Sequence, residues 1–283
     1  MNPMAKTEMD GTGLSFIGCG VMAESMIAGL LREEIVRADQ VVGSHPRAER
    51  RAELEDKYGI RMFDANTEAA THFSGPNAAV VLTVKPQRSS RVLEELAEAV
   101  GQENLVISIV AGTSIETISD ALKNKFVVRA MPNTPSQIGK GMTAWTCSGS
   151  VDEKHKRLAK VLFTALGKEL FVETENMIDM ATSLSATGPT YTFMVMEAMT
   201  DAGVHLGFSR EVSKELVQQT MLGSVLFAME SHKHPAELRN MVTSPGGTSA
   251  EAIYQMEKGA LRTVLSKAIY GAYKRAVELG KRK

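Results

Sequence analysis

The chain has 283 residues, 43% of them hydrophobic, and a formal net charge of −1 at pH 7. The length allows one large domain or two ordinary ones, and the near-neutral charge argues against broad attraction to nucleic acid or to an acidic membrane surface. Two cysteines, Cys19 and Cys147, are too few for a disulfide framework, which is typical of a reducing, cytoplasmic compartment. Residues 1–13 are mixed polar and are expected to form a loose tail. No apolar run approaches the ~20 residues of a membrane span.

The first predicted elements are a strand, a glycine turn and a helix. The apolar run Leu14–Ile17 leads into glycines, and a helical pattern starts near Val21. The first glycine permits a sharp exit from the strand, and the second removes a Cβ where a phosphate must approach the backbone. The helix N-terminus then offers unpaired N–H groups to a pyrophosphate. The residues expected to bind it are Gly18, Cys19, Gly20, Val21, Met22 and Ala23. A βα turn without a ligand is the alternative.

The second strand, Val41-Val42, ends in polar residues that bear on the choice of dinucleotide. An NAD site places an acidic residue at this strand end for the ribose 2′-hydroxyl. Here the strand is followed by Ser44, His45, Pro46 and Arg47, with no acid. Serine, histidine and arginine suit a 2′-phosphate, so the pattern favours NADP over NAD. Alternatively, Arg47 belongs only to the surface of the next helix.

Strands and helices alternate through the rest of this half, which predicts an α/β fold with a doubly wound parallel sheet and right-handed crossovers. The expected strands are Met62-Phe63, 78–83, 105–110, 126–130, 141–147 and 168–172. The expected helices are 48–58, one from Asn66, 89–100, 114–122 with Ser114 as its cap, and 153–165. Pro86 ends one strand so that Lys85 emerges at the carboxyl edge, where ligands bind. A solvated lysine is the alternative there.

From Asn176 onward the pattern is helical almost everywhere, so we expect domains at 1–174 and 175–283. The predicted helices are 177–186, 190–206, 210–231, 235–242, 248–258 and 261–279. The helix from Thr190 is apolar over much of its surface, with Phe193, Met196 and Met199 spaced by three. It is predicted either to lie at an interface or to form an internal core helix.

The run Val242–Glu251 contains a proline and a glycine pair before a predicted helix start. One reading is a capped helix in which Thr248 and Glu251 form a capping box. The other is a carboxylate pocket made of backbone N–H groups at the positive helix end.

Six motifs in order resemble the pyrroline-5-carboxylate reductase family, over nearly the whole chain from Leu14 to about Leu279. These are GCGVMA at 18–23, VKP at 84–86, AG at 111–112, MPNTP at 131–135, GP-x-Y at 188–191 and SPGGTS at 244–249. The resemblance implies an N-terminal NADP-binding Rossmann domain and an all-α C-terminal dimerisation domain. It also implies reduction of 1-pyrroline-5-carboxylate to L-proline, the last step of proline biosynthesis.

By this resemblance, NADPH is the expected cofactor and NADH a weaker one. Its binding residues would be Gly18 to Ala23, Ser44, Arg47, Asn66, Val84, Lys85, Pro86, Ala111 and Gly112. The substrate, a cyclic imine carboxylate, would contact Ser244, Gly246, Gly247, Thr248, Ser249 and His232. Ser249 and Thr248 would carry the catalytic hydroxyls. A homodimer or larger homo-oligomer through the C-terminal helices is implied. From the net charge, the spacing of histidines and cysteines and the lack of a long apolar run, we expect no metal, nucleic acid or membrane partner.

The chain departs from the family pattern at three positions. Ser249 stands where the family usually has threonine, Thr190 where it has alanine, and Met241 where an asparagine is common.

Two other function classes compete with the imine reductase. A related 3-hydroxy-acid dehydrogenase would normally carry a catalytic lysine beside a glycine-asparagine motif, which the SPGGTS turn does not match. A non-catalytic NADP-binding regulator would have no need for the retained hydroxyl.

Overall fold

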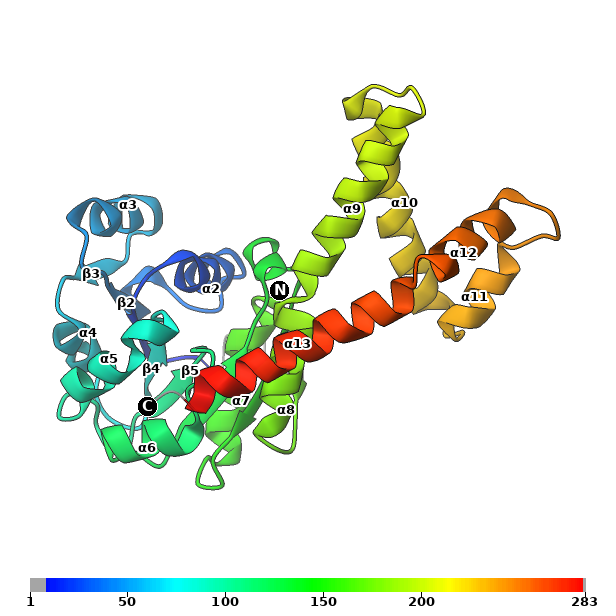
Figure 1. The fold of residues 1–283 in the computed structure, drawn as a ribbon. Helices are drawn as coiled ribbons and strands as arrows, with labels where there is room; N and C mark the ends of the chain where they lie inside the picture. The colour runs from blue at the N-terminus through cyan, green and yellow to red at the C-terminus, as the bar shows by residue number, and fades with distance from the viewer. Residues whose placement is uncertain (1–8, 282–283) are drawn as a thin grey trace. The chain divides into compact units, whose positions relative to one another are not determined.

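The computed structural model describes residues 9–281, and Figure 1 labels most of their helices and some of their strands. The described chain forms two compact units. The first, called the sheet unit here, runs to Thr187 and takes up the chain again from Ala272, while the second, the helical unit, is Gly188–Gly271. This division comes later than the predicted turn at 173–176, because α8 (Asn176–Ala181) packs onto the sheet through Ile178, which is fully buried.

The sheet unit is built on one eight-stranded sheet with the order β3-β2-β1-β4-β5-β6-β7-β8. The strands are β1 (Gly13–Ile17), β2 (Val41–Ser44), β3 (Arg61–Phe63), β4 (Ala78–Leu82), β5 (Leu105–Ser108), β6 (Val127–Met131), β7 (Gly141–Cys147) and β8 (Gly167–Phe171). The strand order reverses between β1 and β4, and such a switch point is where doubly wound sheets bind ligands.

The sheet is not parallel throughout, which corrects the prediction. Strands β3 to β6 run parallel, but β7 is antiparallel to β6, and β8 is then parallel to β7. The reason lies in the β6–β7 connection, which holds only the 3₁₀ helix Thr134–Ile138. Parallel neighbours need a crossover of about a dozen residues or more, and this segment is too short to supply one.

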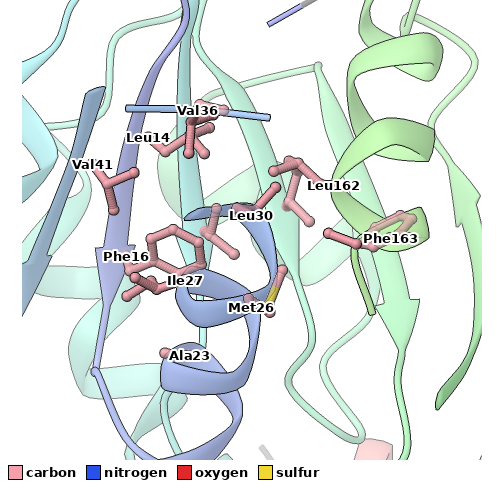
Figure 2. Packing of buried hydrophobic residues seen from close by; sticks show 14 of the residues in the cluster. Leu14, Phe16, Ala23, Met26, Ile27, Leu30, Val36, Val41, Leu162 and Phe163 are labelled. Carbon is pink, nitrogen blue, oxygen red and sulfur yellow. The ribbon is translucent and has the colours of Figure 1, made fainter. Parts of the chain in front are cut away.

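Helices cover both faces of the sheet, as predicted for a doubly wound fold. On one face lie α2 (Val21–Arg32), α3 (Ala48–Tyr58) and α7 (Glu153–Thr164); on the other lie α4 (Asn66–His72), α5 (Ser89–Leu96) and α6 (Ile115–Leu122). Figure 2 shows the first face, where Phe16 of β1 meets Ile27 and Leu30 of α2. The next residue, Ile17, belongs to the opposite cluster, because side chains alternate across a strand.

The predicted loose tail is wrong for the part that the structure describes, while residues 1–8 lie outside it. Met9 is completely buried in the core, and Thr12 is 4% exposed. The Gln40 side-chain amide donates hydrogen bonds to the carbonyl oxygens of Met9 at 3.0 Å and Thr12 at 3.1 Å. These bonds hold the segment before β1 against the start of β2.

Ser114 caps α6 as predicted, since its Oγ accepts a hydrogen bond of 3.1 Å from the Thr117 N–H.

A buried ion cluster joins the sheet to α8. Arg129 of β6 has a side chain only 4% exposed, and its guanidinium binds Glu175 at 3.0 Å and Asp179 at 2.7 Å. The predicted single helix 177–186 is α8 followed by a π-helix, Thr182–Ala186.

The helical unit contains four complete helices and about half of a fifth. They are α9 (Gly188–His205), α10 (Arg210–Ser231), α11 (Pro235–Met241), α12 (Thr248–Lys258) and α13 (Leu261–Lys281), of which the last passes back into the sheet unit. No residue of α9 is buried. The alternative of an internal core helix is therefore not observed within the chain, and Phe193 and Met194 are 57% and 65% exposed.

Within residues 9–281, no helix combines the length and the apolar character needed to cross a bilayer.

Candidate cofactor and substrate site

The glycine turn lies between β1 and α2, at the carboxyl edge of the sheet. Gly18 has φ +91°, a conformation that other residues rarely adopt. A Cβ at this position would lie 2.5 Å from Cγ1 of Val84, which follows β4. The Gly18 N–H donates a hydrogen bond of 3.2 Å to the Ser44 hydroxyl. Gly18 is therefore required by its backbone and by the residues packed against it.

Gly20 is glycine for a different reason. Its φ of −83° suits any residue, and a Cβ there would meet no atom closer than the Gly18 carbonyl oxygen, at 3.9 Å. Gly20 is the N-cap of α2 and no side chain caps this helix. The protein thus leaves open space beside uncapped N–H groups at a positive helix end, which fits the pyrophosphate of a dinucleotide. Val21, the first residue of α2, is 62% exposed beside this space.

Ser44 connects the turn to the neighbouring strands. It is fully buried, and its hydroxyl accepts the Gly18 N–H and donates a hydrogen bond of 2.8 Å to Asn66 Oδ1. The Asn66 amide in turn donates to Glu95 at 3.0 Å. The structure thus brings together Gly18, Ser44 and Asn66, three of the residues expected to bind the cofactor, and the serine hydroxyl points into this network rather than into solvent.

Cys19 and Ala23 face the protein interior. The Cys19 N–H donates to the Ser44 carbonyl oxygen at 2.8 Å, and its Sγ lies where a side chain at Gly43 would otherwise stand. Burial raises the pKa of the Cys19 thiol to about 12, so it stays protonated at neutral pH. Ala23 is 1% exposed, which leaves α2 close to the sheet.

Thr83 is a site residue that the sequence reasoning missed. It follows β4, and its hydroxyl donates to the carbonyl oxygens of Ile17 at 2.8 Å and Gly18 at 3.1 Å. The sequence feature that could have identified Thr83 is a hydroxyl residue at the end of an apolar strand, directly before the Val84-Lys85 pair. Lys85 is exposed and Pro86 begins a short 3₁₀ helix.

The Ala111-Gly112 pair follows β5 and packs against other parts of the sheet unit. Ala111 lies beside the cluster of Met131 and Ile178. Gly112 has φ +75°, and a Cβ there would lie 2.9 Å from the carbonyl carbon of Leu279 in α13. Packing alone therefore requires this glycine, whether or not it also lines a ligand.

The loop after β2 carries a strongly basic cluster. His45, Arg47, Arg50 and Arg51 lie within it and in the first turns of α3, and burial together with the three arginine charges lowers the pKa of His45. Arg50 pairs with Glu24 of α2. Burial by itself would raise the pKa of Glu24.

Hydrogen bonds to the Glu24 carboxylate outweigh that effect of burial. Lys57 donates at 2.8 Å and Tyr58 at 2.9 Å, and with Arg50 they lower the pKa of Glu24 to about 2. The side chain of Glu24 is 19% exposed. This ion cluster joins α2 to α3 directly behind the glycine turn.

The SPGGTS turn lies in the helical unit and has its own close packing. Gly246 has φ +69°, and a Cβ at Gly247 would lie 2.5 Å from the Ser244 hydroxyl. The predicted capping box is wrong: Gly247 is the N-cap of α12 and no side chain caps it. Thr248 is already inside the helix, one residue too late to act as the cap.

The other partner of the predicted capping box is also engaged elsewhere. The carboxylate of Glu251 accepts a hydrogen bond of 2.8 Å from the Gln255 amide, one turn further along α12. The N–H groups of Thr248 and Ser249 therefore have no side-chain cap, and the open helix end suits an anion.

His232 and Met241 belong to the same unit. His232 ends α10 in a left-handed conformation, φ +53°, and is exposed. Met241 is the last residue of α11 and is 57% exposed.

Two family models match the chain. Pyrroline-5-carboxylate reductase dimerisation matches residues 175–279, and NADP oxidoreductase, coenzyme F420-dependent, matches residues 13–112. A pyrroline-5-carboxylate reductase of Synechocystis sp. is 38% identical over 95% of this chain and 98% of its own length. The enzyme of that name from Pseudomonas aeruginosa is 39% identical over 94% and 96%.

Solved structures of pyrroline-5-carboxylate reductases also match the chain. A pyrroline-5-carboxylate reductase of Coxiella burnetii has a TM-score of 0.84 and 34% identity, covering 95% of this chain and 98% of its own. A Plasmodium falciparum pyrroline carboxylate reductase with NADP bound has a TM-score of 0.87 and 28% identity, covering 96% and 99%. With an open glycine turn on the sheet and relatives that match nearly its whole length, the chain belongs to the pyrroline-5-carboxylate reductase family.

Proposed function

We propose that this protein reduces 1-pyrroline-5-carboxylate to L-proline with NADPH, as the last step of proline biosynthesis in the cytoplasm. The observation that supports it most, beside the family membership, is the open space at Gly20 next to the uncapped N-terminus of α2. In this proposal residues 1–174 bind the cofactor, and residues 175–283 bind substrate and a second copy of the chain.

The cofactor would lie along the carboxyl edge of the sheet. Backbone N–H groups of 18–23 would hold the pyrophosphate, and Arg47 the 2′-phosphate. Ser44 and Asn66 would act by fixing the turn, since their side chains bond to each other and Ser44 to Gly18. The nicotinamide half would lie against 84–86 and 111–112. When bound, NADPH supplies the hydride that adds to the imine carbon.

The substrate would be held by the SPGGTS turn. Its carboxylate is suited to the uncapped N–H groups of α12, with Ser244 and the Gly246-Gly247 pair shaping the turn. Because a protonated imine is already electrophilic, positioning accounts for most of the expected rate enhancement and no strong protein acid is needed. Ser249, or a water held by it and Thr248, would relay the proton of the ring nitrogen. His232 is proposed as a further substrate contact.

A homodimer or larger homo-oligomer through the C-terminal helices is part of the proposal. The helical unit leaves a set of large apolar side chains exposed to water, which is energetically unfavourable. They are Phe193, Met194, Met199, Leu216, Leu222, Val225, Leu226, Phe227 and Met229. A second copy of the same helices would cover them. No metal is required by this scheme.

The test is NADPH oxidation measured with 1-pyrroline-5-carboxylate, with its six-membered piperideine homologue and with NADH in place of NADPH. The five-membered ring with NADPH is expected to react fastest. Equal or faster turnover of the six-membered ring would change the proposed substrate, and absence of turnover with either would contradict the reaction.

The variant Ser249→Ala tests the proton relay. Loss of a positioned proton donor is expected to lower kcat about 10- to 100-fold. The affinity for NADPH, measured by fluorescence titration, should stay within about twofold, because the cofactor residues are elsewhere. Ser74→Ala, which removes an exposed hydroxyl before the amino end of β4, is the matched control. Unchanged turnover of Ser249→Ala would remove this residue from the mechanism.

A further inference from the structure

The basic cluster after β2 does not act as four equivalent cations. Arg50 and Arg51 are both bound to acceptors of the protein itself, and His45 accepts the Arg47 N–H through Nδ1 at 3.2 Å. The guanidinium of Arg47 is exposed and has no hydrogen-bond or ion-pair partner among residues 9–281. Only Arg47 therefore has its charged end available to a ligand.

Arg50 is neutralised within the protein. Its side chain is 12% exposed, its two terminal nitrogens pair with Glu24 and, at 2.9 Å, with Glu53, and Lys57 binds Glu24 from the other side. Two carboxylates thus face two cations, so the cluster adds no net charge next to the loop. Arg50 Nε also donates to the Cys19 carbonyl oxygen at 3.4 Å, which ties α3 to the glycine turn.

Arg51 contacts the loop itself. One of its terminal nitrogens, Nη1, donates to the carbonyl oxygens of His45 at 2.8 Å and Pro46 at 3.2 Å. The His45 N–H donates to the Phe63 carbonyl oxygen at 3.0 Å, which anchors the start of the loop to β3. Two groups of Arg51 therefore hold the loop that presents Arg47: its backbone N–H donates to the Arg47 carbonyl oxygen at 3.2 Å, and its side chain binds the carbonyls of His45 and Pro46.

We propose that Arg51 is a positioning residue for cofactor selectivity: it braces the 45–47 loop so that the Arg47 guanidinium meets the 2′-phosphate of NADPH. This deepens the proposed function and rests on it. Arg51 has no contact with the phosphate in this scheme. Its contribution is to hold Arg47 in place before the cofactor arrives, which lowers the entropy lost on binding.

The experiment compares Arg51→Leu, Arg51→Lys, Arg47→Ala and the double variant Arg47→Ala/Arg51→Leu. The dissociation constants of NADPH and NADH are measured by fluorescence titration, which needs no substrate. Thermal unfolding checks that each variant folds. Arg37→Leu is the matched control, because Arg37 is an exposed arginine paired with Asp39 before the amino end of β2.

A charged hydrogen bond to phosphate is worth enough that Arg47→Ala should weaken NADPH binding about tenfold or more. Arg51→Leu should weaken it about tenfold, with NADH binding unchanged within about twofold. In the Arg47→Ala background, Arg51→Leu should weaken NADPH binding by less than about twofold more, because no Arg47 guanidinium is then left for Arg51 to hold in place. Arg51→Lys should resemble Arg51→Leu, since the lysine side chain ends one bond earlier and places its ammonium short of the two carbonyls that Nη1 binds.

Three outcomes would overturn the proposal. If Arg51→Lys behaves like the parent protein, Arg51 acts by its charge alone. If NADH binding falls as much as NADPH binding, its role is only structural. If the Arg47 and Arg51 effects add fully, the two residues act independently.

A protein that binds neither dinucleotide contradicts both this proposal and the proposed function. A protein that binds NADPH but does not reduce the pyrroline contradicts the proposed reaction alone. The selectivity measurement then still decides the role of Arg51.

Discussion

The two units of this protein bury their apolar residues very differently. In the sheet unit Phe16, Phe163 and Leu54 are completely buried, and helices cover both faces of the sheet. Within Gly188–Gly271, all of which the structure describes, Val217 is the only hydrophobic residue that is buried. The sheet unit therefore completes its own core. The helical unit has a surface that resembles half of an interface.

The sequences of two helices explain this difference. In α2 the buried positions Met26, Ile27 and Leu30 lie on the side that meets the sheet, and Arg32 ends the helix in water. In α9 apolar residues occur over much of the circumference, so one neighbour, α10, does not cover them. A helix of this kind is stable only when a second surface packs against it.

The largest expected effect is on the exposed face of the helical unit. Phe193→Lys places a charge where a second copy would pack, and should weaken self-association about a hundredfold or more. Analytical ultracentrifugation over a range of protein concentrations measures it. Gln102→Lys, which adds the same charge to an exposed loop of the sheet unit, is the control. An unchanged association constant for Phe193→Lys would remove α9 from the interface.

Two glycine variants in the sheet unit should act without any dependence on protein concentration. Gly18→Ala forces a strained φ and a clash with Val84, and should lower the free energy of unfolding by about 2 kcal/mol or more. Gly20→Ala should change that free energy by less than about 0.5 kcal/mol but weaken NADPH binding about tenfold, because its methyl group enters the open space.

Urea unfolding and NADPH titration of both glycine variants separate the two effects. The result that would contradict this interpretation is a Gly20→Ala protein that binds NADPH normally, since the space beside Gly20 would then not hold the pyrophosphate.

The smallest expected effect concerns acid stability, also in the sheet unit. The pKa of Glu24 is lowered from 4.5 to about 2, so its stabilisation is fully present above pH 4.5 and is lost as the pH falls from there towards 2. Glu24→Gln should flatten the fall in unfolding free energy over this range and cost about 1 kcal/mol at pH 7. Glu33→Gln, at an exposed ion pair, is the control. If the unfolding free energies of Glu24→Gln and Glu33→Gln depend on pH equally, the stabilisation assigned to Glu24 is contradicted.

Much of the sheet unit could be predicted because its determinants are local. A strand with apolar residues on both sides, a glycine pair and a helical pattern identify β1, the turn and α2 without knowledge of distant residues. The doubly wound sheet followed from the order of such segments. The family, and the reductase activity that it implies, followed from the resemblance of six motifs and are supported by the relatives.

What the sequence by itself determined is therefore the order of strands and helices, the glycine turns and the apolar excess of α9. Only the tertiary structure decided that β7 reverses direction, that Met9 is buried and that Glu251 binds Gln255 rather than capping α12. It also decided that the Ser44 hydroxyl serves the Gly18 turn and that Arg47 alone among its basic neighbours has an available charge. Met9 and Ser44 depend on partners more than 20 residues away in the sequence. Glu251 depends on which of two nearby donors its carboxylate accepts from, and β7 on how its strand is paired after a short connection. None of these is encoded in a local pattern of residue types.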